Sequence, residues 1–346
     1  MISHISVVIS FIVFGVFLVS AFLLDPKKNA YLFFGYISFD GFLRLASDFH
    51  PFVHILPHLV ICLLFLNLFI KKINIFAIHN RTLVPFLFLI AFYTLNIFNI
   101  TYAQNLVNAF IFSIVSYVYY IVPMFLFFIG YFSLSGEDEE TRKFISYLLG
   151  VSLFVCSIAI IQYFIGPEPF ILISQSFKKM ITSTAWFVRG GSGLHFRPTS
   201  TCVSGGIPSI YGIAGVYFSL ALLNRAKIQS KIFLFISMII FVISVYLGAS
   251  RGVFVCFIVG LLSFFILNNI KNIVRIDNLL SALATVTLVL AGFFVSYKMF
   301  GKDFLHRMKE INPEKMVEVR GYDLLYLESQ MMDNPIGAGL GKVAGR

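Results

Sequence analysis

The chain has 346 residues, of which 59% are hydrophobic and 12% are charged, and its 26 Lys and Arg against 16 Asp and Glu give a formal net charge of +10. Soluble globular domains carry about 25% charged residues, so this composition excludes that class and indicates a membrane protein with several spans. The basic excess does not indicate a nucleic-acid partner, because the chain contains no motif of that kind. Basic loops that orient spans and contact anionic membrane lipid account for it.

Predicted membrane spans follow from runs of about 20 mainly apolar residues. Nine runs meet this description, and they are Ser6–Leu24, His54–Ile70, Leu83–Ile100, Leu106–Phe132, Ile145–Ile165, Ile207–Leu223, Ile232–Leu247, Val253–Leu267 and Leu279–Tyr297. A tenth, Tyr31–Leu45, is interrupted by Asp40 and Arg44 and either crosses the membrane, lies at its surface or re-enters. We therefore expect an all-α fold, a polytopic bundle of about 9–10 transmembrane helices that forms a single membrane domain over residues 1–346.

Short loops rich in Lys and Arg mark the cytoplasmic side of a membrane protein. Three such loops agree on one alternation of the spans, and their basic residues are Lys71, Lys72, Arg81, Arg225, Lys227, Lys231, Lys271 and Arg275. This alternation places two long polar segments, Gly166–Gly206 and Lys298–Arg346, on the outer face. Lys27 and Lys28 favour counting the interrupted tenth run as a span.

Metal and disulfide sites are not indicated by the sequence. The four cysteines are scattered, without a C-x-x-C pair or another zinc spacing. His50, His54 and His58 share a helical face at four-residue spacing, which suits a metal site, but prolines interrupt the segment and Asp48 is the only carboxylate close to it. Histidines at the membrane surface are the simpler interpretation, and we expect neither a metal nor a cofactor.

The first outer segment contains "WFVRGGSGLHFRPTSTCVSGG", in which Arg189 and Arg197 flank glycines and small hydroxyl residues. Glycine lets the backbone approach a ligand closely, and Arg197 stands before Pro198, where the chain favours extended geometry. Two interpretations stay open on these residues alone. The segment is either an ordinary loop with arginines at the membrane surface or part of a binding site.

The second outer segment contains "EVRGYDLLYLESQMMDNPIGAGLG". Its apolar residues recur at helical spacing after Arg320, which predicts an amphipathic helix at the membrane surface. Pro335 ends this helix, and Gly337, Gly339 and Gly341 follow. This glycine triplet lacks the spacing and the preceding strand of a dinucleotide site, so we interpret it as a turn.

A third arginine, Arg251, opens the apolar stretch "GASRGVFVCFIVGLL" and also falls on the predicted outer face. At the start of a span, an arginine can extend to the lipid headgroups as a simple anchor. Gly248 and Gly252 around it form a G-x-x-x-G pattern, which permits close contact with another helix. An arginine held in that way is less free to act only as an anchor.

Three stretches, in this order, resemble the O-antigen ligase and polymerase superfamily of bacterial envelope proteins. The stretch "FRPTSTCVSGGIPSIYG" is similar to the external R-P-T segment of that family, and "GASRGVFVCFIVGLL" to its S-R-G signature at the start of a span. The stretch "RGYDLLYLESQMMDNPIGAGLG" is similar to its second outer arginine, helix and N-P-x-G-x-G-x-G element. The resemblance covers about Phe196–Gly341, and the charge argument places all three motifs outside.

The resemblance implies a metal-independent glycosyltransferase of the bacterial cytoplasmic membrane, with its active face outward. Its donor would be an undecaprenyl-diphosphate-linked glycan, and other polysaccharide assembly proteins would be further partners. Arginine offers a planar fork of donors that suits phosphate oxygens, so the resemblance assigns catalytic roles in diphosphate handling to Arg197, Arg251 and Arg320. The substrate-binding residues that it implies are Arg189, Asn334, Gly337 and Gly339.

Asn334 stands where ligases of this family usually carry a histidine, which favours a polymerase of O-antigen or exopolysaccharide repeats. The alternatives are a ligase that transfers the glycan to an acceptor such as lipid A-core, a transporter of lipid-linked glycans, and a non-catalytic assembly subunit. A transporter would place charged residues along its spans, whereas these spans are nearly free of charge. Family members usually continue with further spans after the second outer segment, so the resemblance also implies that this 346-residue chain lacks them.

Overall fold

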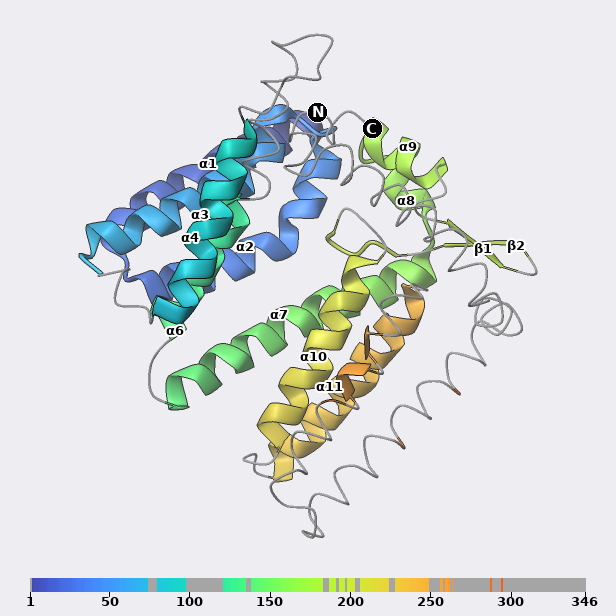
Figure 1. Ribbon diagram of the computed structural model, residues 1–346. Helices are drawn as coiled ribbons and strands as arrows, with labels where there is room; N and C mark the ends of the chain where they lie inside the picture. The colour runs from blue at the N-terminus through green and yellow to red at the C-terminus, as the bar shows by residue number, and fades with distance from the viewer. Residues whose placement is uncertain are drawn as a thin grey trace, which may run out of the picture. The chain divides into compact units, whose positions relative to one another are not determined.

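The computed structural model describes residues 2–73, 80–97, 121–134, 138–182, 187–190, 193–196, 198–202, 206–223 and 228–248, together with a few positions between 256 and 294 (Figure 1). The described residues are almost entirely helical. The elements are α1 (Ile2–Leu23), α2 (Pro26–Ala46), α3 (Pro51–Ile70), α4 (Asn80–Ile97), η2 (Val122–Met124), α6 (Phe125–Leu134), α7 (Asp138–Ile165), α8 (Glu168–Ile171), α9 (Gln175–Thr182), β1 (Phe187–Gly190), β2 (Gly193–Phe196), α10 (Ile207–Leu223) and α11 (Ile228–Leu247). The strands β1 and β2 form one short antiparallel hairpin.

The helical membrane class predicted from composition is confirmed. Four helices of the described part are long and apolar enough to cross a membrane, and they span Ser3–Leu23, Pro51–Ile70, Glu139–Ile165 and Gln229–Leu247. Helix α10 is a shorter apolar helix. The predicted spans Val253–Leu267 and Leu279–Tyr297 fall mostly outside the described residues, so the count of about 9–10 spans stays a prediction.

Helix α2 contains the run that Asp40 and Arg44 were expected to interrupt, and it is continuous from Pro26 to Ala46. Its C-terminal half runs parallel to α7, because Phe34 contacts Phe144 and Phe39 contacts Phe154, with ring centroids 5.4 and 5.0 Å apart. The two helices therefore end on the same side. Helix α2 is not among the helices of the described part that are long and apolar enough to cross a membrane, so its crossing stays a prediction.

The chain divides into two compact units, each built from separate segments. Unit 1 comprises Met1–Ser10, Phe34–His54 and Glu137–Ile311, and unit 2 comprises Phe11–Phe33, Ile55–Gly136 and Asn312–Arg346. Helices α1, α2 and α3 each contribute residues to both units. The expectation of one membrane domain stays a prediction.

In unit 2, buried asparagines join the helices. The Nδ2 amino group of Asn67 in α3 donates to the carbonyls of Ala21 and Leu24, at 2.6 and 3.1 Å. Asn29 Nδ2 donates to the carbonyl of Ser20 at 3.1 Å. The last carbonyls of a helix have no partner within that helix, so these amides satisfy the end of α1.

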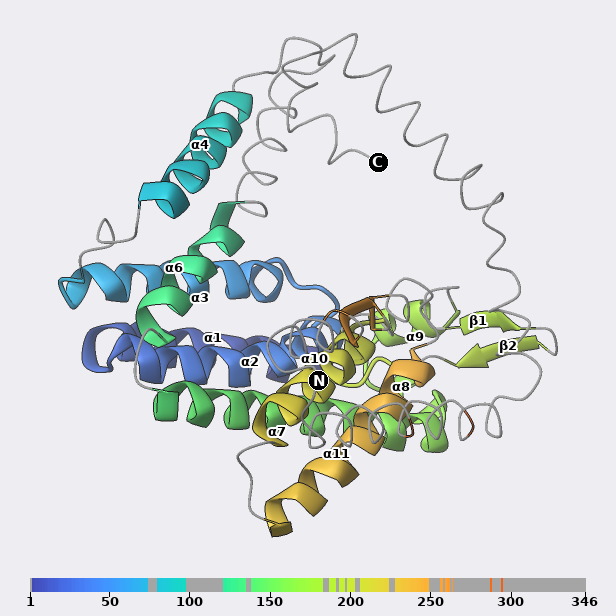
Figure 2. The ribbon, with the colours of Figure 1, turned by 60° about the horizontal axis from the view of Figure 1, so that its bottom comes forward.

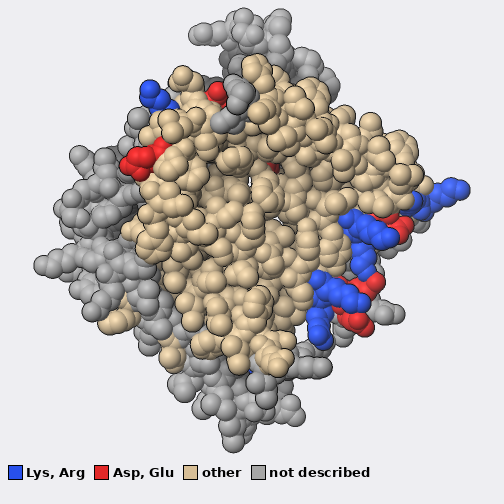
Figure 3. Space-filling model, turned by 180° about the vertical axis from the view of Figure 1, so that it is seen from behind, with Lys and Arg blue, Asp and Glu red and all other residues tan. Residues whose placement is uncertain are grey.

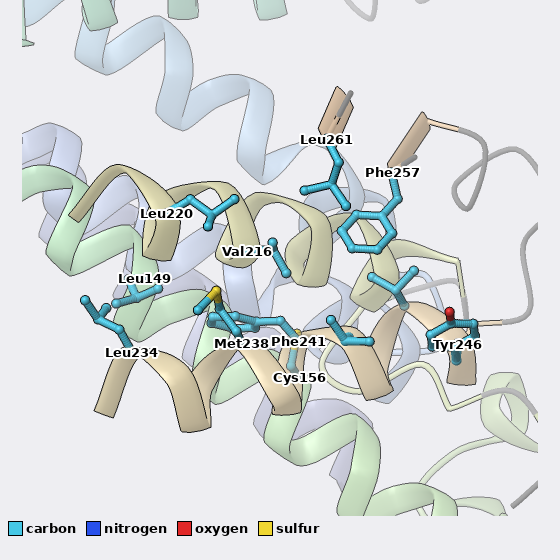
Figure 4. Packing of buried hydrophobic residues seen from close by; sticks show 12 residues of the cluster. Leu149, Cys156, Val216, Leu220, Leu234, Met238, Phe241, Tyr246, Phe257 and Leu261 are labelled. Atoms are coloured by element: carbon cyan, nitrogen blue, oxygen red, sulfur yellow. The ribbon is translucent and has the colours of Figure 1, made fainter. Parts of the chain in front are cut away.

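In unit 1, α7, α10 and α11 pack against one another in all three pairs (Figures 1 and 2). Figure 4 shows the apolar side chains that they share, with Phe241 of α11 among them. The approach of α10 to α11 depends on glycine, because a Cβ added to Gly215 would lie 2.6 Å from the Phe241 ring, and one added to Gly212 would lie 2.8 Å from the Phe241 carbonyl oxygen. Small residues permit such close contact between membrane helices.

Charge is scarce on the described helices. On the face shown in Figure 3, the described surface is mostly uncharged, and its few Lys, Arg, Asp and Glu side chains gather in small groups. The ion pair of Asp40 with Arg44 is largely buried, whereas that of Glu139 with Lys143 is exposed. The buried pair lies at the end of unit 1 that holds the candidate site.

Candidate functional site

One end of unit 1 gathers the C-terminal parts of α7 and α11 and the N-terminus of α10. The Ser209 hydroxyl donates to the Ser244 carbonyl at 3.1 Å, and the Ser244 hydroxyl donates to the Pro208 carbonyl at 3.3 Å. The Cys156 thiol of α7 also donates to the Pro208 carbonyl, at 3.6 Å. Because α7 and α11 end here and α10 begins here, Gly166, Gly206 and Gly248 lie at this end.

The residues that follow Arg197 form a buried turn at this end. Residues Pro198–Cys202 are all buried, and the Cys202 amide donates to the Thr199 carbonyl at 2.9 Å. Helix α7 holds the turn at Ser200, whose amide donates to Gln162 Oε1 at 2.7 Å and whose hydroxyl donates to the Val155 carbonyl at 2.6 Å. The R-P-T motif is thus followed by backbone that is fixed to a candidate span.

Ser200 has an uncommon backbone conformation, with a φ of 55°. The left-handed region costs about 1–2 kcal/mol for a residue with a Cβ, and such conformations persist only where surrounding contacts enforce them. The two bonds of Ser200 to α7 supply that enforcement. The turn is therefore held in one conformation at some energetic cost, a pattern that is frequent at functional sites.

Helix α2 contacts the turn from another direction. The Phe42 amide, inside α2, donates to the Thr201 carbonyl at 2.7 Å. In a regular helix such an amide donates to the carbonyl four residues earlier. An interior amide that donates to a loop carbonyl therefore connects the helix to the loop. The turn is thereby bonded to α2 at Thr201 and to α7 at Ser200.

Asp40 lies two residues before Phe42 and Arg44 lies two residues after it, and together they form the buried ion pair. Arg44 Nε lies 2.7 Å from Asp40 Oδ2 without the linear N–H···O geometry of a hydrogen bond, so the contact is mainly between charges. The Tyr36 hydroxyl donates to Asp40 Oδ1 at 2.9 Å. Arg44 Nη1 lies 3.5 Å from His54 Nδ1. Both carboxylate oxygens of Asp40 are therefore engaged.

Cys202, at the end of the turn, is also buried. Burial, with a smaller effect from the Asp40 carboxylate, raises the pKa of its thiol to about 12. The thiolate is the reactive form of cysteine, so Cys202 is a protected, protonated thiol at neutral pH. Its protection depends on the turn staying in place.

Two polar atoms beside the turn have no hydrogen-bond partner among the described residues. They are Thr199 Oγ1 and Gln162 Nε2, and both side chains are buried. Buried polar groups without a protein partner are commonly satisfied by internal water. They add to the polar character of an end that is otherwise surrounded by apolar helices.

A second corner of unit 1 joins α9 to the connection between α2 and α3. Asp48 Oδ1 accepts the amide of Ser176 at 2.7 Å, and the Ser174 hydroxyl donates to the Leu45 carbonyl at 2.6 Å. Phe177 is fully buried against Leu45 and Ala46. This part of the segment is thus attached to the end of α2 by one bond and one aromatic side chain, and to the connection after α2 by a second bond.

The structure places few of the residues predicted for the site. Arg189 lies on β1, where its backbone pairs with Leu194 of β2. Arg197 directly precedes the described turn and lies outside the described residues, as do Arg251, Arg320, Asn334, Gly337 and Gly339. Whether the three arginines meet stays a prediction.

The histidines weighed as metal ligands lie on α3 and the residue before it. His54 faces the guanidinium of Arg44, which is a poor neighbour for a bound cation. The described part of the chain contains no group of three or more His, Cys, Asp or Glu that could hold a metal ion.

Several residues of this end were not singled out from the sequence. Asp40 and Arg44 were noted only as interruptions, although their four-residue spacing on a helix is the spacing of an ion pair, and Tyr36 precedes Asp40 by the same interval. Gln162 and Ser200 carry no signal in the sequence, because their roles arise from contacts between distant segments.

Comparisons with known proteins provide no further assignment. No protein-family model, no curated protein and no solved structure matches the chain. The similarity to the O-antigen ligase and polymerase superfamily therefore depends on the three motifs in the sequence.

Proposed function

We propose that the chain is a membrane glycosyltransferase that polymerises undecaprenyl-diphosphate-linked oligosaccharide repeats at the outer face of the bacterial cytoplasmic membrane. The observation that carries the proposal is the buried turn Thr199–Cys202, which fixes the residues after Arg197 to α2 and α7. It lies at the same end of unit 1 as Gly248, where the chain leads toward Arg251.

The chemistry of such a transfer suits arginines on a rigid support. A hydroxyl of the acceptor attacks the anomeric carbon of the donor sugar, the bond to the diphosphate oxygen breaks, and the hydroxyl proton is lost to a base. Negative charge collects on the departing diphosphate, and positioned donors stabilise it without having to reorganise. Arginine binds phosphate oxygens in pairs with a planar fork, which suits the role proposed for Arg197.

Deletion of the gene tests the proposal against its alternatives, with surface polysaccharide resolved on gels. A polymerase predicts that long chains disappear while single repeats remain attached. Accumulation of unattached lipid-linked polymer would contradict polymerisation and indicate a ligase. An unchanged pattern would refute both activities.

Complementation then tests the arginine. Arg197→Ala is expected to leave only single repeats, and Arg197→Lys to restore chains partly, because lysine keeps the charge and loses the fork. Lys178→Ala is the matched control, since Lys178 is an exposed cation of the same outer segment. Membrane protein levels are compared by immunoblot, and wild-type chains from Arg197→Ala would refute the assigned role.

A further inference from the structure

The short segment between α7 and α9 leaves one large apolar side chain in the open. Leu172, directly after α8, is 84% exposed. Its apolar neighbours instead pack against the buried cluster formed by the end of α2 and Phe177, and these neighbours are Phe170, Ile171 and Ile173. Leu172 is therefore held outside the core by residues that the core holds on both sides of it.

The backbone around Leu172 is fixed as well. The Ile173 amide donates to the Phe170 carbonyl at 3.1 Å, and the Ser174 hydroxyl donates to the Leu45 carbonyl at 2.6 Å. Leu172 cannot turn inward without breaking these contacts. Its exposure is thus a property of a built segment and not of a loose loop.

Exposed apolar side chains also cover the end of α7, the helix that precedes this segment. Ile161, Phe164 and Ile165 are 55%, 71% and 55% exposed. Helix α7 is long and apolar enough to cross a membrane, and Ile165 is its last residue. Side chains exposed on such a helix contact lipid, so an apolar surface that faces lipid extends to the end of α7.

The chain turns at the end of α7. Gly166 has a left-handed φ of 84°, and its amide donates to the Gln162 carbonyl at 3.0 Å, which is a common way to end a helix. Leu172 follows Gly166 by six residues, and six residues span at most about 20 Å, or less where they are helical as in α8. The headgroup region on each side of a bilayer is about 5–8 Å thick. Leu172 is therefore within reach of the membrane surface in which α7 ends.

We propose that Leu172 inserts into the leaflet in which α7 ends, so that the segment of residues 166–182 is anchored along the membrane surface. The partner that fits this surface is lipid, with acyl chains around Leu172 and headgroups around α9. The inference does not depend on the proposed function. It gives this segment a role that none of the three sequence motifs assigns.

Continuity with α7 favours lipid over a protein partner. A single exposed leucine is ordinary on a protein surrounded by water, but this one follows closely after exposed side chains that already face acyl chains. The exposed residues near it are polar, and they are Glu168, Gln175 and Lys178. Lysine extends its ammonium group to lipid phosphates while its stem lies on apolar surface, whereas Glu168 suits the water side of the headgroups. An apolar side chain with polar residues around it is typical of a segment that lies at a membrane surface.

Tryptophan fluorescence tests the proposal on the full-length chain. The chain has one tryptophan, Trp186, so Trp186→Phe provides a dark background in which Leu172→Trp is the single emitter. The protein is reconstituted into vesicles of phosphatidylethanolamine and phosphatidylglycerol, with or without bromine on the acyl chains near the headgroup. Leu172→Trp is expected to lose emission to the brominated lipid about as strongly as Phe164→Trp, the reference in α7, and to be quenched little by iodide in the water.

Gln175→Trp is the matched control, because Gln175 is an exposed residue of the same segment with a polar side chain. It is expected to be quenched by lipid bromine at least about threefold less than Leu172→Trp and to remain open to iodide. Since both sites are exposed, both variants are expected to fold, and equal elution on size-exclusion chromatography checks this.

Three results would overturn the inference. Quenching of Leu172→Trp by iodide without quenching by lipid bromine would place Leu172 in water. Equal quenching of Leu172→Trp and Gln175→Trp by lipid bromine would show that the new indole ring, and not the position of Leu172, causes insertion. Protection of Leu172→Trp from both quenchers would show that protein covers it, and loss of this protection at a higher ratio of lipid to protein would identify a second copy of the chain as the cover.

Discussion

The left-handed backbone conformation of Ser200 predicts that glycine at this position destabilises the turn less than alanine does. Ser200→Ala removes the bond from the hydroxyl to the Val155 carbonyl and keeps the left-handed φ of 55°. A net loss of about 1 kcal/mol is expected, the usual value of one intramolecular hydrogen bond.

Ser200→Gly removes the same bond but also removes the Cβ that makes this φ unfavourable. Relief of about 1–2 kcal/mol offsets the lost bond, and the greater freedom of glycine in the unfolded chain costs about 0.5–1 kcal/mol. The three contributions nearly cancel. Ser200→Gly is therefore expected to lie close to the wild type.

The assay is the rate at which Cys202 reacts with a maleimide, in the full-length chain without the other three cysteines. A local opening that becomes easier by about 1 kcal/mol raises the rate about fivefold, so Ser200→Ala is expected to react about fivefold faster than the parent and Ser200→Gly within about twofold. Equal elution on size-exclusion chromatography checks global folding. Faster reaction of Ser200→Gly than of Ser200→Ala would refute the argument from strain.

Four further predictions use thermal unfolding, labelling and chain length. Gly212→Ala is expected to destabilise the protein by about 1–3 kcal/mol, because its new Cβ meets a backbone carbonyl. Gly150 has open space around it, so Gly150→Ala is the control and is expected to stabilise the protein or change it little. Equal melting temperatures of the two variants would contradict the close packing of α10 and α11. Asn67→Leu is expected to cost about 1–3 kcal/mol, since the carbonyls of Ala21 and Leu24 lose their donor. An unchanged melting temperature would argue against that contact. A single cysteine at Ser192 is expected to react with an impermeant thiol reagent in intact cells, and reaction only after lysis would reverse the predicted topology. Arg251→Lys is expected to lower polymerisation about tenfold and Arg251→Ala further, with chain length on gels as the measure; wild-type chains from both would return Arg251 to the role of an anchor.

Helices were predictable from the sequence where burial in lipid alone decides the structure. Apolar runs of sufficient length become helices in a membrane, since every backbone group must be satisfied internally, and α1, α3, α7 and α11 follow this rule. The place of α2 relative to the membrane was ambiguous from the sequence, because Asp40 and Arg44 each cost free energy to bury when counted singly. Their four-residue spacing lets each neutralise the other on a continuous helix, which a hydropathy argument does not count.

The site was less predictable, because its contacts join distant parts of the chain. The motif at Arg197 is contiguous in the sequence and could be recognised there. The residues that bond to the turn after it, Phe42 and Gln162, come from distant helices. Phenylalanine is common in membrane helices, and a lone glutamine is uncommon there but does not reveal its partner. Only packing shows that an amide inside α2 and a glutamine of α7 meet one turn, so these partners had to come from the structure.

The attachment of α9 to the corner after α2 sets an order of assembly. An isolated helix of eight residues is not stable in water, and α9 is capped by Asp48, which leaves the ribosome 128 residues before Ser176. The ribosome therefore synthesises Asp48 and the connection after α2 long before α9. Helix α9 is held by its contacts with Leu45, Ala46 and Asp48, so its formation reports that this segment has met the corner after α2. A nascent chain stalled before Gln175 would leave the Asp48 carboxylate without this amide partner, and release of the chain would complete the corner.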